Sequence, residues 1–149
     1  MNRVVAALSL SVAFAAGCGA THFLRPAHAA ENLTAQVIST GEMEGDKISA
    51  VNTGGMRNKV LGVADGMTIS IQDGNVGKHM HPNTNEIQYI LEGTGTVWLG
   101  DKEVRVKPGD LVVIPKGTPH GGTKPNGRTI KAIAIKTPPQ RPDDTKLLN

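Results

Sequence analysis

Cysteine is nearly absent from this chain: Cys18 is the only one among 149 residues. An intrachain disulfide is therefore excluded, and so is a thiolate nucleophile or metal ligand in a domain that follows residue 18. Aromatic residues are also few, with two Phe, one Tyr and one Trp. A hydrophobic core must consequently be built from aliphatic side chains.

Clustered positive charge is missing too. The formal net charge is +3, but Arg3 and Arg25 precede all 13 acidic residues, so the chain after residue 30 carries 14 basic and 13 acidic residues, a balance of +1. These basic residues are scattered along the sequence. Nucleic-acid binding needs a basic patch or stripe, so we expect no nucleic-acid partner.

The sequence has no apolar run long enough to span a bilayer comfortably. Val4–Ala16 follows a short basic start and has the length of a signal-peptide apolar region. Ala27-His28-Ala29 forms an A-x-A cleavage site, and polar chain follows it. We therefore favour a signal peptide over residues 1–29 and an exported protein, periplasmic or secreted.

A second interpretation of this region uses the cysteine. Ala15-Ala16-Gly17-Cys18 resembles a bacterial lipoprotein box, although it lacks the usual leucine three residues before the cysteine. Cys18 would then carry a lipid that anchors the protein to a membrane. An uncleaved N-terminal anchor is a third alternative.

Glycine and proline are plentiful, with 18 and 9 residues, which is typical of short strands and tight turns. Apolar and polar residues alternate over Met67–Gln72, which predicts a half-buried strand, and Asp65-Gly66 before it is a hairpin-turn signal. Other strands are predicted at Lys59–Ala64, Glu86–Glu92, Thr94–Leu99, Lys102–Val106, Leu111–Ile114 and Arg128–Lys136. No segment has a convincing helical period. The pattern predicts one all-β domain, a sandwich or a barrel, over residues 58–137.

Two flanking segments lie outside this domain. Residues 30–57 are interpreted as an N-terminal arm in which Leu33–Thr40 forms either a strand or a surface loop. The segment after it is rich in turn residues. Residues 138–149 are rich in proline and charge, so we expect a flexible C-terminal tail.

Four residues are candidates for a metal site: His79, His81, Glu86 and His120. They include every histidine after residue 30. Residues i and i+2 of a strand point to the same face, so His79 and His81 can reach one ion together. Three imidazoles and a carboxylate suit Fe, Mn, Zn, Ni or Cu better than Ca or Mg. Four ligands on an ion that accepts six leave positions open for water or a small molecule.

The spacing of these residues closely resembles the two signature motifs of the cupin superfamily. The first motif is matched by His79-Met80-His81, a four-residue gap, Glu86, a six-residue gap and Gly93, with a leading glycine, Gly74, one place off. The second motif is matched by Gly109, Pro115, Gly117 and His120, with Lys124 in place of the final asparagine. Fifteen residues separate Gly93 from Gly109, as in many small single-domain bacterial cupins.

This resemblance covers Lys59 to Thr137, and it implies a jelly-roll β-barrel with the metal inside. Each of the four candidate ligands matches a ligand position of the motifs, so the resemblance assigns a metal-ligand role to all four. Cupins of this size are often homodimers, so we also expect a homodimer.

Strand parity suggests one further residue of the site. If Glu86 points inward, Gln88 and Ile90 point inward as well, while Tyr89 faces the other way. Gln88 would then lie near the ion and orient a substrate or bound water; alternatively, it hydrogen-bonds a neighbouring strand. Exposed basic residues such as Lys116, Lys124 and Arg128 either line the barrel mouth or form an ordinary solvated surface.

The resemblance and the ligands leave two functions open. The favoured one is a metal-dependent enzyme acting on a small oxygenated substrate, of dioxygenase, isomerase, decarboxylase or lyase type. The alternative is a binding module that holds a small molecule, such as a sugar or carboxylate, or the metal itself, without turnover. Fold analogy cannot choose among these activities.

Overall fold

The structure is a computed structural model that describes residues 33–48, 55–64 and 66–149. The predicted signal peptide and both processing sites, at Cys18 and Ala29, lie outside the described residues, as does Asp65 of the predicted hairpin turn. No helix in the described part of the chain is long and apolar enough to span a membrane.

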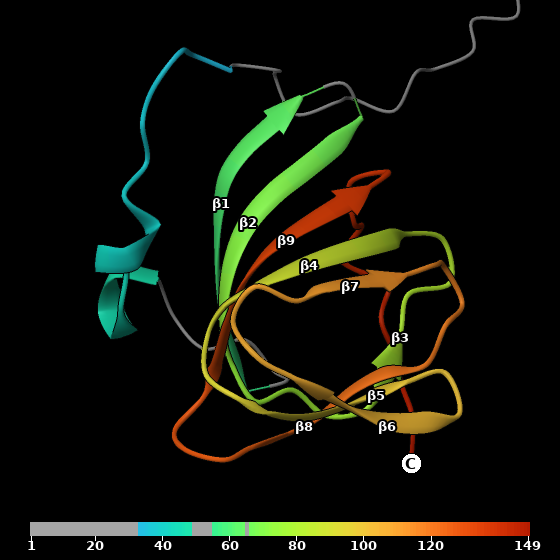
Figure 1. The fold of residues 1–149 in the computed structure, drawn as a ribbon. Coiled ribbons are helices and arrows are strands. Elements are labelled where there is room, and N and C mark those ends of the chain that lie inside the picture. The colour runs from blue at the N-terminus through green and yellow to red at the C-terminus, as the bar shows by residue number, and fades with distance from the viewer. Residues whose placement is uncertain (1–32, 49–54, 65) are drawn as a thin grey trace, which may run out of the picture.

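Two five-stranded antiparallel sheets face each other and form a barrel (Figure 1). One sheet has the order β1-β2-β9-β4-β7 and the other β10-β3-β8-β5-β6. The strands are β1 Met56–Ala64, β2 Met67–Gly74, β3 His79–Met80, β4 Asn85–Glu92, β5 Gly95–Leu99, β6 Lys102–Val106, β7 Leu111–Ile114, β8 His120–Pro125, β9 Ile130–Thr137 and β10 Lys146–Leu147. The predicted all-β jelly-roll barrel is confirmed.

Seven of these strands overlap the segments predicted from the sequence. The other three, β3, β8 and β10, were not among those segments. His79 and His81 were expected to share a strand, but β3 ends at Met80, so only His79 belongs to it. β3 and β10 have only two residues each, and β8 reads HGGTKP. Glycine, lysine and proline are all depleted in strands, so β8 has almost no local strand signal. Its pairing with β3 and β5 depends on contacts distant in sequence.

The register across the first sheet decides which side chains enter the barrel. Thr68 of β2 lies opposite Lys136 of β9, which in turn lies opposite Glu86 of β4. One row further along the strands, Ala134 lies opposite Gln88. Directly opposed residues share one face of a sheet, so Lys136, Glu86 and Gln88 all point into the barrel.

One end of the barrel interior is filled by an aliphatic core. Its buried members come from both sheets: Ile90, Val106, Val112, Ile114, Ile130 and Ala132. Only a small void of about 30 Å³ remains among these side chains. A larger open space lies beside Glu86, which pairs with Ile114 of this core.

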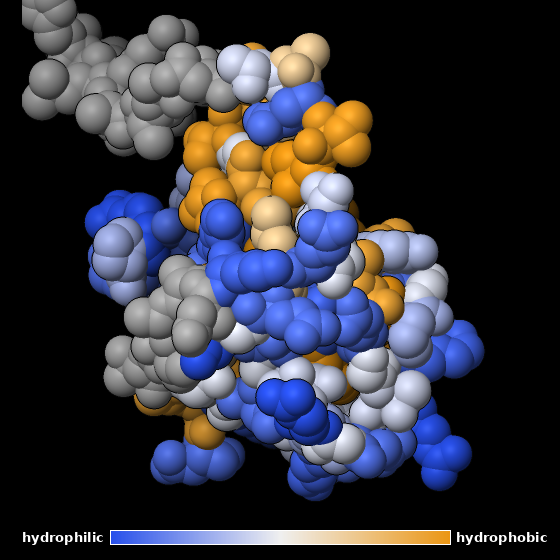
Figure 2. Space-filling model, turned by 90° about the vertical axis from the view of Figure 1, so that its left-hand side faces the viewer, coloured by the Kyte–Doolittle hydropathy of each residue, from blue (hydrophilic) through white to orange (hydrophobic). Residues whose placement is uncertain are grey.

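The N-terminal arm packs against the outside of the barrel, next to β1 (Figure 1). Residues 33–39 form no strand, and two short 3₁₀ helices follow, η1 Thr40–Glu42 and η2 Gly45–Ile48. η2 packs on β1 and β2, where Ile48 and Ile71 are fully buried. Figure 2 shows hydrophobic side chains gathered on the upper part of this face of the molecule.

The C-terminal segment differs from the flexible tail expected for residues 138–149. It folds back along the barrel, and β10 pairs with β3. Asp144 is 3% exposed, and its carboxylate accepts hydrogen bonds from the backbone N–H and side-chain amide of Asn83 and from the hydroxyl of Thr84. These bonds join the segment to the turn between β3 and β4.

Candidate metal centre

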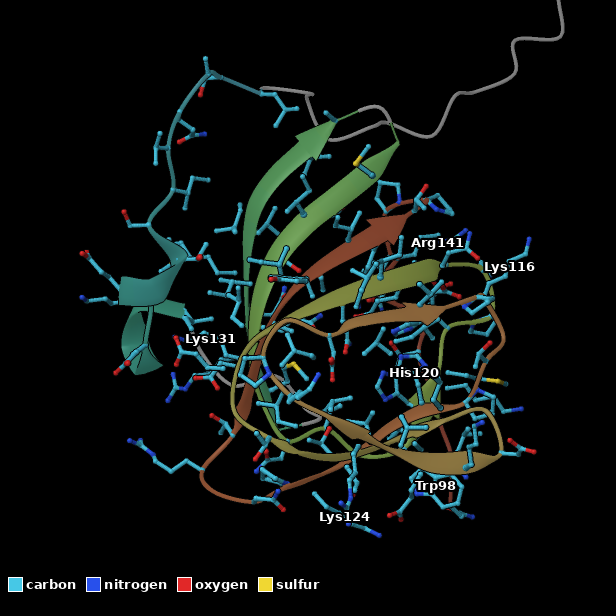
Figure 3. All side chains as sticks on the ribbon, in the orientation of Figure 1. Trp98, Lys116, His120, Lys124, Lys131 and Arg141 are labelled. Atoms are coloured by element: carbon cyan, nitrogen blue, oxygen red, sulfur yellow. The ribbon has the colours of Figure 1, made fainter. Side chains whose placement is uncertain are left out.

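The four candidate ligands come from both sheets and meet inside the barrel. His79 lies in β3 directly opposite His120, the first residue of β8. His81 follows β3, and Glu86 is the second residue of β4. All four are buried, with 7% or less of each exposed. Figure 3 shows His120 pointing into the barrel.

The ring nitrogens and one carboxylate oxygen converge on a small region. One ligand nitrogen of each histidine lies within 4.8 Å of the others, so the three histidines could hold a metal ion. Glu86 Oε2 lies 3.2 Å from Nε2 of His81 and 3.6 Å from Nε2 of His120. The structure thus brings together all four residues that the sequence singled out.

Backbone carbonyls orient all three imidazole rings. Nδ1 of His79 lies 2.7 Å from the carbonyl oxygen of Gly77, and Nδ1 of His120 lies 2.9 Å from that of Thr118. Nδ1 of His81 lies 2.7 Å from the carbonyl oxygen of Asp144.

A carbonyl oxygen only accepts hydrogen bonds, so each Nδ1 must be the protonated nitrogen. Each neutral ring therefore has its lone pair on Nε2. Fixing the tautomer of a histidine through its other nitrogen is the usual arrangement for metal-binding histidines.

The electrostatics of the site favour a neutral His79 and an ionised Glu86. Burial, together with the neighbouring His120, lowers the pKa of His79 to about 4. Burial by itself raises the pKa of Glu86, but hydrogen bonds that Nε2 of His120 and of His81 donate when protonated, together with the charge of Lys136, hold that pKa well below its usual value. Metal ligands must be deprotonated in this way.

Two buried atoms of the site have no hydrogen-bond partner among the described residues: Oε2 of Glu86 and Nε2 of His120. With Nδ1 protonated, Nε2 of His120 and of His81 are acceptors that face an ionised acceptor oxygen. Acceptors at such distances repel one another, and a buried unsatisfied polar group is costly. A cation between them removes both penalties, so these residues fit a metal ion.

Gln88 contacts the carboxylate rather than a neighbouring strand. Its Nε2 donates a hydrogen bond of 2.9 Å to Oε1 of Glu86. This bond holds one carboxylate oxygen and leaves the other, Oε2, directed at the histidines. Gln88 thus lies inside the barrel, beside Glu86.

Lys136 is a residue of the site that the sequence interpretation missed. Its Nζ lies 3.4 Å from Oε2 of Glu86 and 3.5 Å from Nε2 of His81, and it also donates to Oε1 of Gln140. Strand parity could have indicated that Lys136 points inward, because it lies on the same face of its strand as Ala132 and Ala134. Its position next to Glu86 depends on the pairing of β9 with β4, which the sequence does not reveal.

A cavity of about 420 Å³ adjoins these residues. Its walls comprise His79, His81, Glu86 and Gln88. The other polar wall residues are Asn58, Gln72, Lys136, Gln140 and Thr145, and the apolar ones are Met56, Val76, Pro142 and Leu147. Its volume is within the range of small-molecule sites. Part of this wall comes from the C-terminal segment.

The exposed basic residues considered from the sequence do not line this cavity. Lys116 and Lys124 point away from the barrel interior (Figure 3). Lys124 pairs with Glu103 on the surface, and Arg128 is exposed. The positive charge near the candidate ligands comes from Lys136 instead.

Fold and site together define a jelly-roll barrel with a buried histidine cluster that can hold a metal ion. Residues 67–135 match the family described as cupin domain. The match covers the part of the barrel from β2 to β9, which contains all four candidate ligands.

Two curated relatives share the barrel region. The chain is 37% identical to an uncharacterized protein of Methanocaldococcus jannaschii over 70 aligned residues. This alignment covers 47% of this chain and 56% of that protein. It is 36% identical to acireductone dioxygenase 1 of Physcomitrium patens over 78 aligned residues. This alignment covers 45% of this chain and 40% of that protein. The matches thus span about half or less of the length of these relatives.

Solved structures show the same fold. An uncharacterized conserved protein with a double-stranded β-helix domain from Klebsiella pneumoniae superposes with a TM-score of 0.59 at 15% identity. That match covers 78% of this chain and 99% of the other. KdgF from Halomonas sp. superposes with a TM-score of 0.53 at 25% identity, over 64% of this chain and 89% of that one.

Proposed function

We propose that this protein is an exported, metal-dependent enzyme of the cupin superfamily that acts on a small oxygenated substrate. The observation that carries the proposal is the convergence of three histidine rings and Glu86 Oε2 inside the barrel, where His79, His81 and Glu86 border a 420 Å³ cavity. His79, His81, Glu86 and His120 would hold one divalent transition metal ion. Such an ion supplies Lewis-acid polarisation of a bound oxygen.

The chain's own residues give this site its other properties. The backbone carbonyls hold the rings in one tautomer, and Gln88 holds the carboxylate of Glu86 in place. The apolar residues of the cavity wall exclude water from a substrate bound beside them. The name of the relative in Physcomitrium patens points to dioxygenase activity, so the first assays follow oxygen consumption.

The metal is tested first. We expect the chain from Ala30 onward, purified without a metal-affinity tag, to contain about one transition-metal ion per chain by elemental analysis. The His79→Ala/His120→Ala variant should contain almost none. If the wild type takes up no stoichiometric metal even after reconstitution, the proposal is wrong.

Turnover separates the enzyme from a binding module. The metal-loaded protein is incubated with a panel of diketones, diols and organic acids, and oxygen uptake and product formation are followed. Turnover that is absent in the His79→Ala/His120→Ala variant supports the enzyme. Tight binding of a panel member without turnover would favour the binding module instead.

Export is part of the proposal and depends on the N-terminal 29 residues. We expect the mature protein, isolated from a bacterial host, to begin at Ala30 by intact mass. Processing that is blocked by globomycin would instead show lipidation of Cys18. A full-length protein retained in the cytoplasm would contradict export.

We further propose that the protein is a homodimer that pairs through the outer face of β4 and β7. Tyr89 opposes Leu111 across these strands, and Ile87 opposes Val113. Tyr89, Leu111 and Val113 are each about half exposed, at 46%, 62% and 55%. A second copy of the same apolar face is self-complementary, as a twofold interface requires.

A further inference from the structure

Lys136 is a charged side chain buried beside the candidate metal centre. Its side chain is 13% exposed, and it belongs to the inner face of β9. Apart from the candidate ligands, it is the only formally charged residue among the described residues that line the 420 Å³ cavity. Placing a charge in so enclosed a site is costly unless the charge is paired.

The present partners of Lys136 are largely the metal-binding atoms themselves. Its ammonium group has three protons. One is donated to Oε1 of Gln140, and the other neighbours are Oε2 of Glu86 at 3.4 Å and Nε2 of His81 at 3.5 Å. Both of these atoms are candidate ligand atoms, so a bound metal ion competes with Lys136 for their lone pairs.

The position of Lys136 is held from the C-terminal segment. The side-chain oxygen of Gln140 accepts a hydrogen bond from the ammonium group of Lys136. The amide nitrogen of Gln140 donates a hydrogen bond of 2.7 Å to the hydroxyl of Thr145. Both residues line the cavity. The ammonium is thus fixed at the cavity wall by neutral groups and is not neutralised by a second carboxylate there.

The charges of the loaded site require a further anion. Glu86 contributes one negative charge, whereas Lys136 and a divalent ion contribute three positive charges. Since the cavity wall holds no other described acidic residue, a negative charge on the bound molecule would satisfy both cations. A hydrogen bond between an ammonium and a carboxylate or enolate oxygen is among the strong ones.

We propose that Lys136 binds an anionic oxygen of the substrate, so that the site takes small carboxylates or enolates in preference to neutral diols, ketones or sugars. This inference rests on the proposed function and specifies its substrate class. Gln140 is a positioning residue that keeps the ammonium directed into the cavity.

The test compares two probes of the same shape, pyruvate and its neutral amide, pyruvamide. Their dissociation constants are measured by calorimetry on the metal-loaded protein and on the metal-free protein. We expect Lys136→Met to weaken pyruvate binding about 10- to 100-fold, the range for a lost hydrogen bond to a charged group. Pyruvamide binding should change less than about twofold, and Lys136→Arg should restore much of the pyruvate affinity.

Control variants separate this role from a structural one. Lys124→Met removes a lysine that is exposed and paired with Glu103, and it should leave both affinities unchanged. Thermal unfolding and metal content of each variant show that the site is intact. The titration of metal-loaded Lys136→Met is compared with the wild type only if this variant also binds one metal ion per chain. If Lys136→Met does not fold, Lys136→Arg provides the comparison.

The two proposals fail in different ways. If no metal binds to the wild type, the proposed function is wrong, but a Lys136-dependent preference for pyruvate in the metal-free titration still supports the anion site. If pyruvate and pyruvamide bind equally in the wild type, or Lys136→Met and Lys136→Arg leave their ratio unchanged, Lys136 does not select anions.

Discussion

Each of the three histidines in the barrel donates its Nδ1 proton to a backbone carbonyl, and this decides which nitrogen faces the site. The acceptors belong to Gly77, Thr118 and Asp144. Because backbone carbonyls do not titrate, the tautomers stay the same as long as the loops keep their shape. The chemistry at the residue scale therefore depends on loop geometry as much as on the ligands.

Gln88 gives the first prediction at this scale. Gln88→Leu removes the donor to Oε1 of Glu86 and frees the carboxylate to rotate. We expect metal affinity to fall about 10- to 100-fold, the usual effect of losing a partner of a metal ligand. Competition with a chromophoric chelator measures the affinity.

The matched control for this prediction is Gln72→Leu. Gln72 lines the same cavity, but it has no hydrogen bond to a candidate ligand in the described part of the chain. Its replacement should leave metal affinity nearly unchanged. Equal losses in both variants would show that the polarity of the cavity matters and the bond to Glu86 does not.

At the scale of elements, the pairing of β3 with β8 is what brings His79 and His120 together. Gly121 follows His120 and has φ +88. A Cβ at this position would lie 2.7 Å from the carbonyl oxygen of Gly77 and 2.9 Å from Nδ1 of His79. Those are the two atoms of the hydrogen bond that orients His79, so β8 requires glycine here for steric reasons as well as for φ.

Gly121→Ala should therefore lower both stability and metal affinity. Gly109→Ala is the matched control, because Gly109 has a similar φ of +92 but nothing within 4 Å of a Cβ. We expect Gly109→Ala to cost only the left-handed backbone penalty, about 1–2 kcal/mol in the free energy of unfolding. Urea unfolding and chelator titration of both variants should show a larger loss for Gly121→Ala in each measurement.

The C-terminal segment is the second element on which the site depends. The buried carboxylate of Asp144 joins it to Asn83 and Thr84, and its carbonyl oxygen accepts from His81. Burial raises the pKa of this carboxyl, but the hydrogen bonds from Thr84 and Asn83 outweigh burial and lower it. The carboxylate is therefore ionised where it anchors the segment.

Asp144→Ala leaves these donors without a partner. We expect it to reduce the free energy of unfolding by about 1–3 kcal/mol, the cost of an unsatisfied buried polar group, and to weaken metal binding through His81. Asp143→Ala is the control, since Asp143 is 70% exposed and pairs with Arg141 on the surface. If the two variants behave alike in urea unfolding and chelator titration, the segment does not support the site.

At the scale of the whole molecule, the barrel interior divides into a packed part and an open part. The aliphatic core fills one part, and the candidate metal centre with its cavity lies beside it. The outer face of β4 and β7 has no described cover over Tyr89, Leu111 and Val113. This face is where the homodimer proposal can be tested.

Replacing Leu111 and Val113 by glutamate places four charges in a twofold interface. We expect the double variant to sediment as a monomer while the wild type sediments as a dimer, because unpaired buried charges oppose association. Val37→Glu is the control, since Val37 is 95% exposed on the N-terminal arm. A wild-type monomer at micromolar concentration would contradict the proposal.

The sequence alone predicted the all-β barrel, seven of its strands and the four residues that meet at the site. Such features are local: alternation over Met67–Gln72 and the i, i+2 spacing of His79 and His81 each report a side-chain direction. The same parity predicts Gln88 inside and Tyr89 outside.

Only the tertiary structure revealed what surrounds those four residues. Lys136 meets Glu86 through the register of β9 against β4, 50 residues away in the chain, and His81 is held by a carbonyl 63 residues away. A backbone carbonyl has no side-chain signature, and a proline-rich segment resembles a disordered tail. The sequence indicates the candidate ligands through the local spacing of His79 and His81 and through the resemblance to known motifs. The partners that orient and charge the site arise from pairings between distant segments, which leave no such signal.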